Sequence, residues 1–364
     1  MKRFFMLFLL SAIAGSAVFA QIDLQPVAII QLTRSEPLTV RQLRTEMERM
    51  IWPNLTMQLR RTPTAEELTR AVNNSTVAER RQILDAFINE RLILQAAERD
   101  RITVTDNELN QQMAQLRAMM SQDIGRPVTD EEFALAIHNE TGMALPAFRE
   151  RMRREGTVQR YLLTTKQHIF ANVREPTEAE IVSVYNLRRS EFIRPDMIRF
   201  SMIQVPYGPN AATKAQARQQ AERLSREIGS SPTRFSEAVL ASRRPNSGYL
   251  AGDGQWIPLN PEGQMLAGAD FINTAFTLQQ GEVSRIIEGH NAYLIIKVTE
   301  TLPQTALGLD DLMSPMNPVT VRQLISDRLM QQLQQEALVR AFSELIADLR
   351  GQSTIRIMEN NLNW

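Results

Sequence analysis

Cysteine is absent from the 364 residues of this chain. Its absence excludes disulfide bridges, zinc–thiolate sites and a cysteine-linked lipid, so the stability of the folded chain has to come from burial. Histidine is scarce as well: His138, His168 and His290 are not spaced like ligands of one metal ion. No motif of a serine hydrolase is present either. We therefore expect no metal, no cofactor and no hydrolytic activity.

The chain also has no excess of charge of either sign. Its 41 basic and 41 acidic residues cancel to a formal net charge of zero. Without an overall electric field, the composition predicts neither nucleic acid nor an anionic membrane as a partner. Apolar residues make up 43% of the chain, which is enough to build cores, and the length predicts two or three domains.

Long hydrophobic runs are missing except at the start of the chain. Lys2 and Arg3 precede an apolar run over residues 4–13, and small residues follow up to Ala20. This pattern predicts a secretory signal peptide over residues 1–20, with cleavage before Gln21. The run is shorter than the roughly 20 residues that a membrane-spanning helix needs, and no later segment approaches that length. We therefore expect an exported protein without stable membrane insertion.

Helical patterns dominate residues 38–193. Several helix starts carry a capping box, in which a threonine accepts a hydrogen bond from a backbone N–H and a glutamate three residues later reaches back to the cap. These boxes are Thr64 with Glu67, Thr105 with Glu108, Thr129 with Glu132, and Thr177 with Glu180. Between them, residues 83–94 place apolar side chains along one stripe, which predicts a helix buried on one face.

Two short β-type runs lie near the ends of the chain, over residues 26–32 and 354–358. The first is expected to end where turn and cap residues gather, over residues 33–37. Because a lone strand leaves its backbone groups unsatisfied, we expect the two runs to pair with each other. Such pairing would make the helical domain discontinuous.

A different pattern occupies the chain between these helical parts. Residues 198–205 and 293–298 are strand-like, residues 211–228 are helical, and glycine and proline cluster over residues 245–268. A loop over residues 302–318, a helix over 319–349 stopped by Gly351, and the last strand follow. The fold class is therefore α+β. The predicted parts are residues 21–194 and 302–364 for the helical domain and residues 195–301 for an inserted α+β domain.

Particular runs of residues resemble a known family. In the helical part these are residues 84–97 (LDAFINERLILQAA), 102–108 (ITVTDNE) and 178–181 (EAEI). In the order found here, they resemble the SurA/PrsA group of exported foldases over essentially the whole mature chain. The inserted domain resembles parvulin-type prolyl isomerases, which are FKBP-like α+β domains, through residues 235–238 (FSEA), 251–256 (AGDGQW), 271–284 (FINTAFTLQQGEVS) and 293–298 (YLIIKV).

The inserted domain departs from the parvulin pattern at its polar positions. Met202 and Leu294 stand where parvulins carry strand histidines, and Arg244 stands where an acidic residue or cysteine is usual. The barrier to X-Pro rotation, about 18–20 kcal/mol, falls when the imide loses its double-bond character, so a catalyst has to hold the twisted bond in a polar, hydrogen-bonded setting. Methionine and leucine donate no hydrogen bond, and arginine reverses the sign of the third group. We therefore expect little or no isomerase activity and assign no catalytic residue.

What remains is a degenerate pocket that would bind polypeptide. Its candidate residues are Met202, Arg244, Trp256, Met265, Phe271, Phe276 and Leu294. An alternative interpretation makes Met202 and Leu294 ordinary core residues, since each strand of a packed sheet buries one face. An active parvulin-type isomerase with a rearranged site is the enzymatic alternative.

The resemblance implies a periplasmic, ATP-independent chaperone whose partners are unfolded or extended polypeptides, such as outer-membrane protein precursors. Methionines in the helical half fit this function, because flexible thioethers suit a surface that accepts many apolar sequences, although such methionines also fill ordinary cores. They are Met47, Met50, Met57, Met113, Met119, Met120, Met143 and Met152. An assembly scaffold with one dedicated partner is a third hypothesis. Both a monomer and a homodimer are compatible with the sequence.

Overall fold

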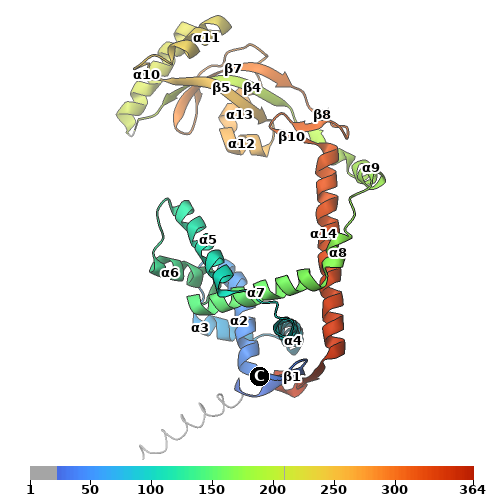
Figure 1. The fold of residues 1–364 in the computed structure, drawn as a ribbon. Helices are drawn as coiled ribbons and strands as arrows, with labels where there is room; N and C mark the ends of the chain where they lie inside the picture. The colour runs from blue at the N-terminus through green and yellow to red at the C-terminus, as the bar shows by residue number, and fades with distance from the viewer. Residues whose placement is uncertain (1–22, 209) are drawn as a thin grey trace, which may run out of the picture. The chain divides into compact units, whose positions relative to one another are not determined.

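The computed structural model describes residues 23–208 and 210–364. The signal peptide predicted over residues 1–20 lies outside these residues. The chain divides into two compact units, of which the first combines residues up to Arg174 with Leu333–Trp364 and the second is Glu175–Gln332 (Figure 1). We refer to them as the helical unit and the inserted unit. The discontinuous α+β arrangement expected from the sequence is confirmed.

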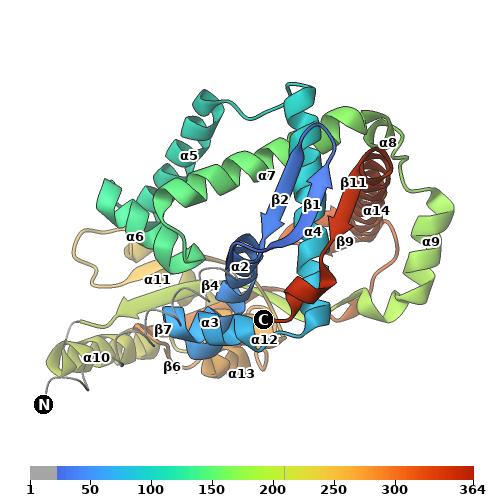
Figure 2. The same ribbon diagram turned by 90° about the horizontal axis from the view of Figure 1, so that it is seen from below.

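The helical unit is closed by a small antiparallel sheet in the order β11-β1-β2 (Figure 2). Its elements are β1 (Pro26–Gln31), β2 (Ser35–Thr39), α2 (Val40–Leu59), α3 (Ala65–Asn73), α4 (Val77–Arg99), α5 (Asp106–Ile124), α6 (Asp130–Thr141), α7 (Leu145–Thr165), α8 (Gln167–Ala171), the later part of α14 (Val321–Gln352), β11 (Thr354–Ile357) and the 3-10 turn η2 (Glu359–Leu362). Ala28 lies opposite Ile357, so the expected pairing of the two terminal runs is confirmed.

Two sequence expectations about this sheet and its helix are wrong. Residues 35–39 form the strand β2 rather than part of a turn, and Pro37 is tolerated there because β2 is an edge strand. The helix α14 runs through Gly351 and ends at Gln352, just before β11 begins. A glycine lowers helix stability only by about 1 kcal/mol, which tertiary packing readily overrides.

The capping boxes fix the helix starts as expected. All four predicted boxes form, at α3, α5, α6 and α9 (Glu178–Leu187). Three further boxes were not expected, at Thr39 with Gln42, Thr76 with Glu79, and Asn210 with Thr213. For two of them the reason is that glutamine or threonine at the third helical position can reach back to the cap like glutamate, so a search for the Thr–Glu pattern alone overlooks them. The Thr76–Glu79 box follows that pattern and was simply missed.

The core of the helical unit is assembled from both ends of the chain. Ile30 of β1, Ile88 of α4, Leu345 of α14 and Leu362 of η2 belong to one buried cluster, and each is 3% exposed or less. Burying one such side chain contributes about 1.5–3 kcal/mol. The unit therefore needs its first and last strands together.

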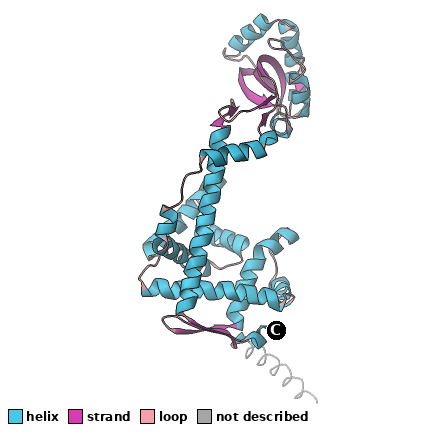
Figure 3. Cartoon of the chain, turned by 90° about the vertical axis from the view of Figure 1, so that its right-hand side faces the viewer, coloured by secondary structure: helices cyan, strands magenta, loops and turns pink. Residues whose placement is uncertain are grey.

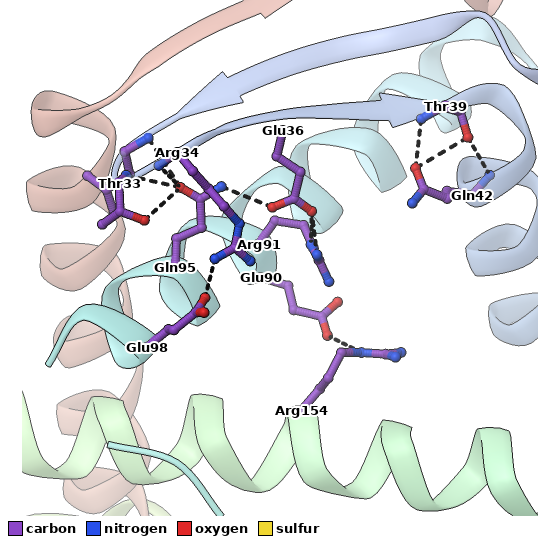
Figure 4. Close-up of polar contacts among 11 residues, drawn as sticks. Thr33, Arg34, Glu36, Thr39, Gln42, Glu90, Arg91, Gln95, Glu98 and Arg154 are labelled. Carbon is purple, nitrogen blue, oxygen red and sulfur yellow. Dashed lines mark hydrogen bonds and ion pairs between the residues drawn. The ribbon is translucent and has the colours of Figure 1, made fainter. Parts of the chain in front are cut away.

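A buried glutamine fixes the β1–β2 turn on α4 (Figure 4). Gln95 is 1% exposed, and its side-chain oxygen accepts hydrogen bonds from the backbone N–H groups of Leu32, Thr33 and Arg34 at 3.1–3.4 Å. Its amide nitrogen donates to the carboxylate of Glu36 at 3.0 Å. The turn thus meets its hydrogen-bonding needs through α4, which sets the position of the hairpin.

A buried arginine fixes the last residues of the chain in a similar way. Arg80 is 4% exposed and donates to the backbone carbonyls of Leu362 at 2.8 Å, of Asn73 at 2.9 Å and of Trp364. The indole of Trp364 lies between two guanidinium groups, 3.8 Å from that of Arg80 and 4.1 Å from that of Arg44. Removing this arginine would leave three carbonyls without a donor.

The inserted unit is built on a four-stranded antiparallel sheet in the order β5-β4-β7-β6, drawn in magenta in Figure 3. Its elements are α9, the 3-10 turn η1 (Arg189–Glu191), β3 (Ile193–Arg194), β4 (Met197–Pro206), α10 (Ala211–Ile228), α11 (Pro232–Ala241), β5 (Leu250–Pro258), α12 (Pro261–Ala267), α13 (Ala269–Ala275), β6 (Ile287–Glu288), β7 (Ala292–Leu302), β8 (Thr305–Ala306), β9 (Leu312–Ser314), β10 (Asn317–Thr320) and the first part of α14. Separate clusters pack on the two faces of the sheet, one with α10 and α11 and the other with α13.

A third cluster explains where the two units divide. Phe192, Leu307 and Val321 are buried together, and the backbone N–H of Leu307 donates to the carbonyl of Phe192 at 2.8 Å. The short strands β8, β9 and β10 occupy residues expected to form a loop. These contacts join residues 175–194 and 302–332 to the inserted unit, whereas the sequence patterns predict boundaries at 194/195 and 301/302.

Candidate functional site

Four of the candidate pocket residues lie together on one face of the large sheet. Met202 of β4 and Leu294 of β7 pack in the same cluster as Phe271 of α13 and Phe276 just after it. In the strand register, Met202 lies opposite Ile296 and Gln204 lies opposite Leu294, so both candidate strand positions point to the same face. We call Phe200, Met202, Phe271, Phe276 and Leu294 the sheet-face cluster.

The structure does not place the other three candidates with this cluster. Met265 on α12 is 82% exposed, and Arg244 is exposed in the turn after α11. Trp256 lies opposite Arg199 on the far side of a bulge, which puts two residues of β5 against one of β4. Because a one-residue slip reverses the direction of a strand side chain, the bulge turns Trp256 to the face opposite Met202.

The sheet-face cluster is apolar and partly open. The rings of Phe200 and Phe271 meet edge to face with their centroids 5.0 Å apart, while Met202, Phe276 and Leu294 are only half-buried. These five side chains contain no hydrogen-bond donor and no titratable group. The cluster therefore presents apolar contacts and no hydrogen-bond donor of its own.

Open space adjoins the cluster at the neighbouring strand. Gly252 of β5 lies opposite Met202, and a Cβ atom built on this glycine would meet no other atom within 4 Å. The nearby hydroxyl of Ser201 donates to the carboxylate of Asp253 at 2.8 Å, but these alternate positions belong to the opposite face of the sheet. The space at Gly252 therefore adjoins Met202 on the face of the sheet-face cluster.

A second apolar site lies between α2, α3 and α4 of the helical unit. This α2–α4 groove encloses about 410 Å³ and is lined by Met47, Met50, Ile51, Ala71, Asn74, Ser75, Glu79, Gln82, Ile83 and Ala86. Met47 forms its buried floor, whereas Met50 is 50% exposed at its opening. Sequence reasoning noted these methionines without locating the groove. The signal that could have found it is the spacing of Met47, Met50 and Ile51 along one face of a helix.

A third cavity, between α2, α6 and α7, has more charged residues in its lining than the α2–α4 groove. It encloses about 300 Å³, and its apolar lining includes Trp52, Leu68 and Met143. Several charged side chains also line it, among them Glu48, whose pKa is raised by burial. An apolar side chain bound there would lie beside these charges.

Other kinds of site find no support. Within residues 23–208 and 210–364, no group of three or more His, Cys, Asp or Glu side chains is arranged to hold a metal ion. None of the helices that the structure describes is long and apolar enough to span a bilayer.

Comparison with known proteins identifies both parts of the chain. Residues 4–162 match the family described as the SurA-like N-terminal domain, and residues 176–312 match the PPIC-type PPIase domain. The chain belongs to the SurA/PrsA group of foldases. Within this SurA/PrsA-type chain, the helical unit corresponds to the first match and the inserted unit to the second.

Individual SurA/PrsA relatives are distant in sequence. Chaperone SurA of Chromohalobacter salexigens is 27% identical over 225 residues, which cover 62% of this chain and 48% of that protein. The chain thus spans about half the length of the curated SurA proteins it matches. Foldase protein PrsA of Clostridium botulinum is 20% identical over 289 residues, which cover 78% of this chain and 75% of that protein.

Solved SurA-like structures resemble this SurA/PrsA-type chain only loosely. One of two SurA-like chaperones of Campylobacter jejuni is 12% identical, and the alignment covers 92% of this chain and 100% of that one. The TM-score of 0.37 is too low to support an argument from the superposition.

Proposed function

We propose that this protein is an ATP-independent periplasmic chaperone that binds unfolded exported polypeptides, including outer-membrane protein precursors. The similarity to proteins named as SurA chaperones and PrsA foldases supports this function. The observation that carries it is the α2–α4 groove, an apolar cavity open at the surface of the helical unit.

The lining of this groove fits a broad range of apolar side chains. Unbranched methionine side chains change shape at low cost and fill irregular gaps, and Met47 and Met50 supply them at the floor and at the opening. Ile51 and Ile83 add apolar walls, and Gln82 belongs to a polar rim that can bind a peptide backbone. Affinity would thus come from burial rather than from a specific sequence.

The inserted unit would bind polypeptide without isomerising proline. The sheet-face cluster would offer apolar contacts for a proline ring. The resemblance to parvulins implies that its Met202 and Leu294 stand where those enzymes carry histidines. Catalysis requires stronger binding of the twisted imide than of the planar one, which apolar groups alone do not provide. The proposed role of this unit is therefore an additional binding surface.

The periplasmic location rests on the predicted signal peptide over residues 1–20 and on the SurA relatives. Export would bring the mature chain together with precursors that have crossed the inner membrane unfolded. A chaperone in that compartment has to work without nucleotide, and no phosphate-binding motif stands in the sequence.

The test is suppression of aggregation. An unfolded β-barrel precursor is diluted from urea, with and without the protein and without nucleotide, and light scattering is followed. We expect the full mature chain to suppress scattering at a few-fold molar excess. Failure of the unmodified protein at several-fold excess would remove the chaperone function and favour a scaffold with one dedicated partner.

A matched pair of variants tests whether the α2–α4 groove is the site. Met50→Glu places a charge at the opening of the groove, and we expect suppression to fall at least several-fold, because an unpaired charge is costly to bury. Met57→Glu is the control, since Met57 lies on the same helix, is 72% exposed and is outside the groove. Equal suppression by the two variants would assign the binding to another surface.

A further inference from the structure

One edge of the large sheet is open. In the described part of the chain, β5 stands at the end of the strand order and pairs only with β4. It has nine residues, whereas strands usually have about five or six. The section Leu250–Asp253 lies in regular register before the bulge, and its free backbone groups can pair with another extended chain.

The usual protection of an exposed edge is weak at this section. Edge strands generally carry lysine, proline or inward-pointing charges that discourage pairing. Leu250 is 62% exposed, Gly252 is exposed, and the only charged residue of β5 is Asp253. The carboxylate of Asp253 accepts a hydrogen bond from Ser201, so it is held against the protein's own sheet.

The open space at Gly252 connects this edge with the sheet-face cluster. A strand added beside β5 would lie about 4.8 Å away, and its side chains would alternate between the two faces of the sheet. Because Gly252 has no side chain and a Cβ there would meet nothing within 4 Å, an apolar side chain of the added strand can extend across it towards Met202. Glycine in a strand often marks such a close approach.

We propose that the free edge of β5 binds an extended segment of an unfolded polypeptide as an additional strand, with alternate side chains placed against the sheet-face cluster. Backbone hydrogen bonds at Leu250–Asp253 supply affinity for any extended chain, and the space at Gly252 selects an apolar side chain at the position beside it. Segments of alternating apolar and polar residues fit this edge best. The inference rests on the proposed chaperone function and adds a binding mode to it.

The decisive experiment uses backbone methylation of a peptide. A nine-residue peptide of alternating apolar and polar residues is made in two N-methylated forms, methylated at odd or at even positions, and binding to the full mature chain is measured by fluorescence anisotropy. Successive amides of a strand point to opposite sides, so only one form loses the bonds to β5. We expect the two forms to differ on the order of tenfold in Kd, from loss of a few hydrogen bonds. Equal affinities would overturn the proposal.

A variant pair tests the space at Gly252. Gly252→Val fills that space with a residue favoured in strands, and we expect peptide affinity to fall several-fold. Gly351→Ala is the control, because that glycine also has empty surroundings but lies at the end of α14 in the helical unit. Unchanged affinity in Gly252→Val would overturn the proposal, and the methylated peptides on the unmodified chain decide it if this variant does not fold.

Other outcomes separate this binding mode from the chaperone function. If the protein suppresses aggregation but does not distinguish the methylated peptides, the edge proposal fails and the chaperone function stands. If the chain is a dimer that Gly252→Val dissociates and neither peptide competes, the edge binds a second copy of the chain and the proposal is overturned.

Discussion

The helical unit and the inserted unit obtain their cores from the chain in different ways. The helical unit joins β1 to β11 and holds its last residues through Arg80, across more than 280 positions of sequence. The inserted unit forms its sheet within residues 197–302, and its hydrogen bond between Ser201 and Asp253 spans only 52 positions. The first unit therefore depends on both ends of the chain, and the second depends on a continuous segment.

The two units also differ in the kind of binding surface that we propose for each. The α2–α4 groove lies between helices, whose side chains can shift to admit different apolar groups. The sheet-face cluster lies on a hydrogen-bonded sheet, which fixes Met202 and Leu294 in one register. An adaptable surface and an ordered edge are complementary ways to hold an unfolded chain.

The largest expected effect comes from deleting residues 351–364. This removes β11 and the buried Leu362, and it takes away two of the carbonyls that Arg80 contacts. We expect the helical unit to lose roughly 5 kcal/mol of stability from lost burial and an unpaired buried charge, with little change in the inserted unit. Domain-resolved hydrogen exchange measures both, and an equal loss of protection in the two units would contradict the comparison.

Arg80→Leu should have the next largest effect. The carbonyls of Asn73, Leu362 and Trp364 would lose their donor, so we expect about 3 kcal/mol less stability in the helical unit. Urea unfolding followed by tryptophan fluorescence checks this. Arg81→Leu is the control, because that neighbouring side chain is more exposed and forms surface ion pairs worth about 0–1 kcal/mol. Equal midpoints for the two variants would argue against the anchoring role of Arg80.

Gln95→Leu should lower the free energy of unfolding of the helical unit by about 2 kcal/mol, because it leaves the N–H groups of the β1–β2 turn without their acceptor.

Ser201→Ala is the corresponding substitution in the inserted unit. It removes one hydrogen bond to Asp253, so we expect the free energy of unfolding of that unit to fall by about 1 kcal/mol. Hydrogen exchange should assign each loss to a different unit. If either substitution weakened both units equally, the two would not be independent.

The smallest expected effect is the loss of stability of the helical unit at acid pH. Hydrogen bonds from Arg61, Arg160 and Arg126, followed by hydrogen bonds from the caps, lower the pKa of three capping carboxylates to about 2. The carboxylates belong to Glu67, Glu108 and Glu132. Because these pKa values are depressed in the folded state, their stabilisation is present above the ordinary value of 4.5 and is lost as pH falls towards 2.

The helical unit contains four Thr–Glu capping boxes, whereas the inserted unit contains one, at the start of α9, and caps α10 without charge through Asn210 and Thr213. When thermal unfolding is followed between pH 5 and pH 2, the helical unit should therefore lose more stability than the inserted unit. A variant with all three capping glutamates changed to glutamine should show a flatter dependence on pH, and Glu131→Gln, a substitution in the first turn of α6 outside the box, should not. Identical pH profiles for the triple variant and the unmodified chain would contradict this account of the caps.

Features carried by local chemistry could be predicted from the sequence. Capping boxes can be recognised within four residues, and the two strand-like runs near the chain ends were expected to pair because a lone strand leaves its backbone groups unsatisfied. The resemblance to parvulins also predicted that Met202 and Leu294 belong to one pocket, and the strand register places both on the same face of the sheet. Whether that face binds polypeptide stays a prediction.

Features set by long-range geometry could not be predicted. The bulge that turns Trp256 away is an insertion relative to β4, visible only once both strands are paired. The exposure of Met265 depends on how α12 packs, and the α2–α4 groove depends on three helices meeting. The strand β2 was hidden because Ser35 and Pro37 are typical of turns, and Gln95, distant in sequence, satisfies the turn beside it.

We propose that the sheet-face cluster holds a proline without assisting rotation of its peptide bond. The direct test is the cis–trans exchange rate of an X-Pro peptide, measured by NMR with substoichiometric full-length mature protein. Because Met202 and Leu294 donate no hydrogen bond, we expect the rate to equal that of the peptide alone. An acceleration of about tenfold or more, in protein free of other isomerases, would contradict the account.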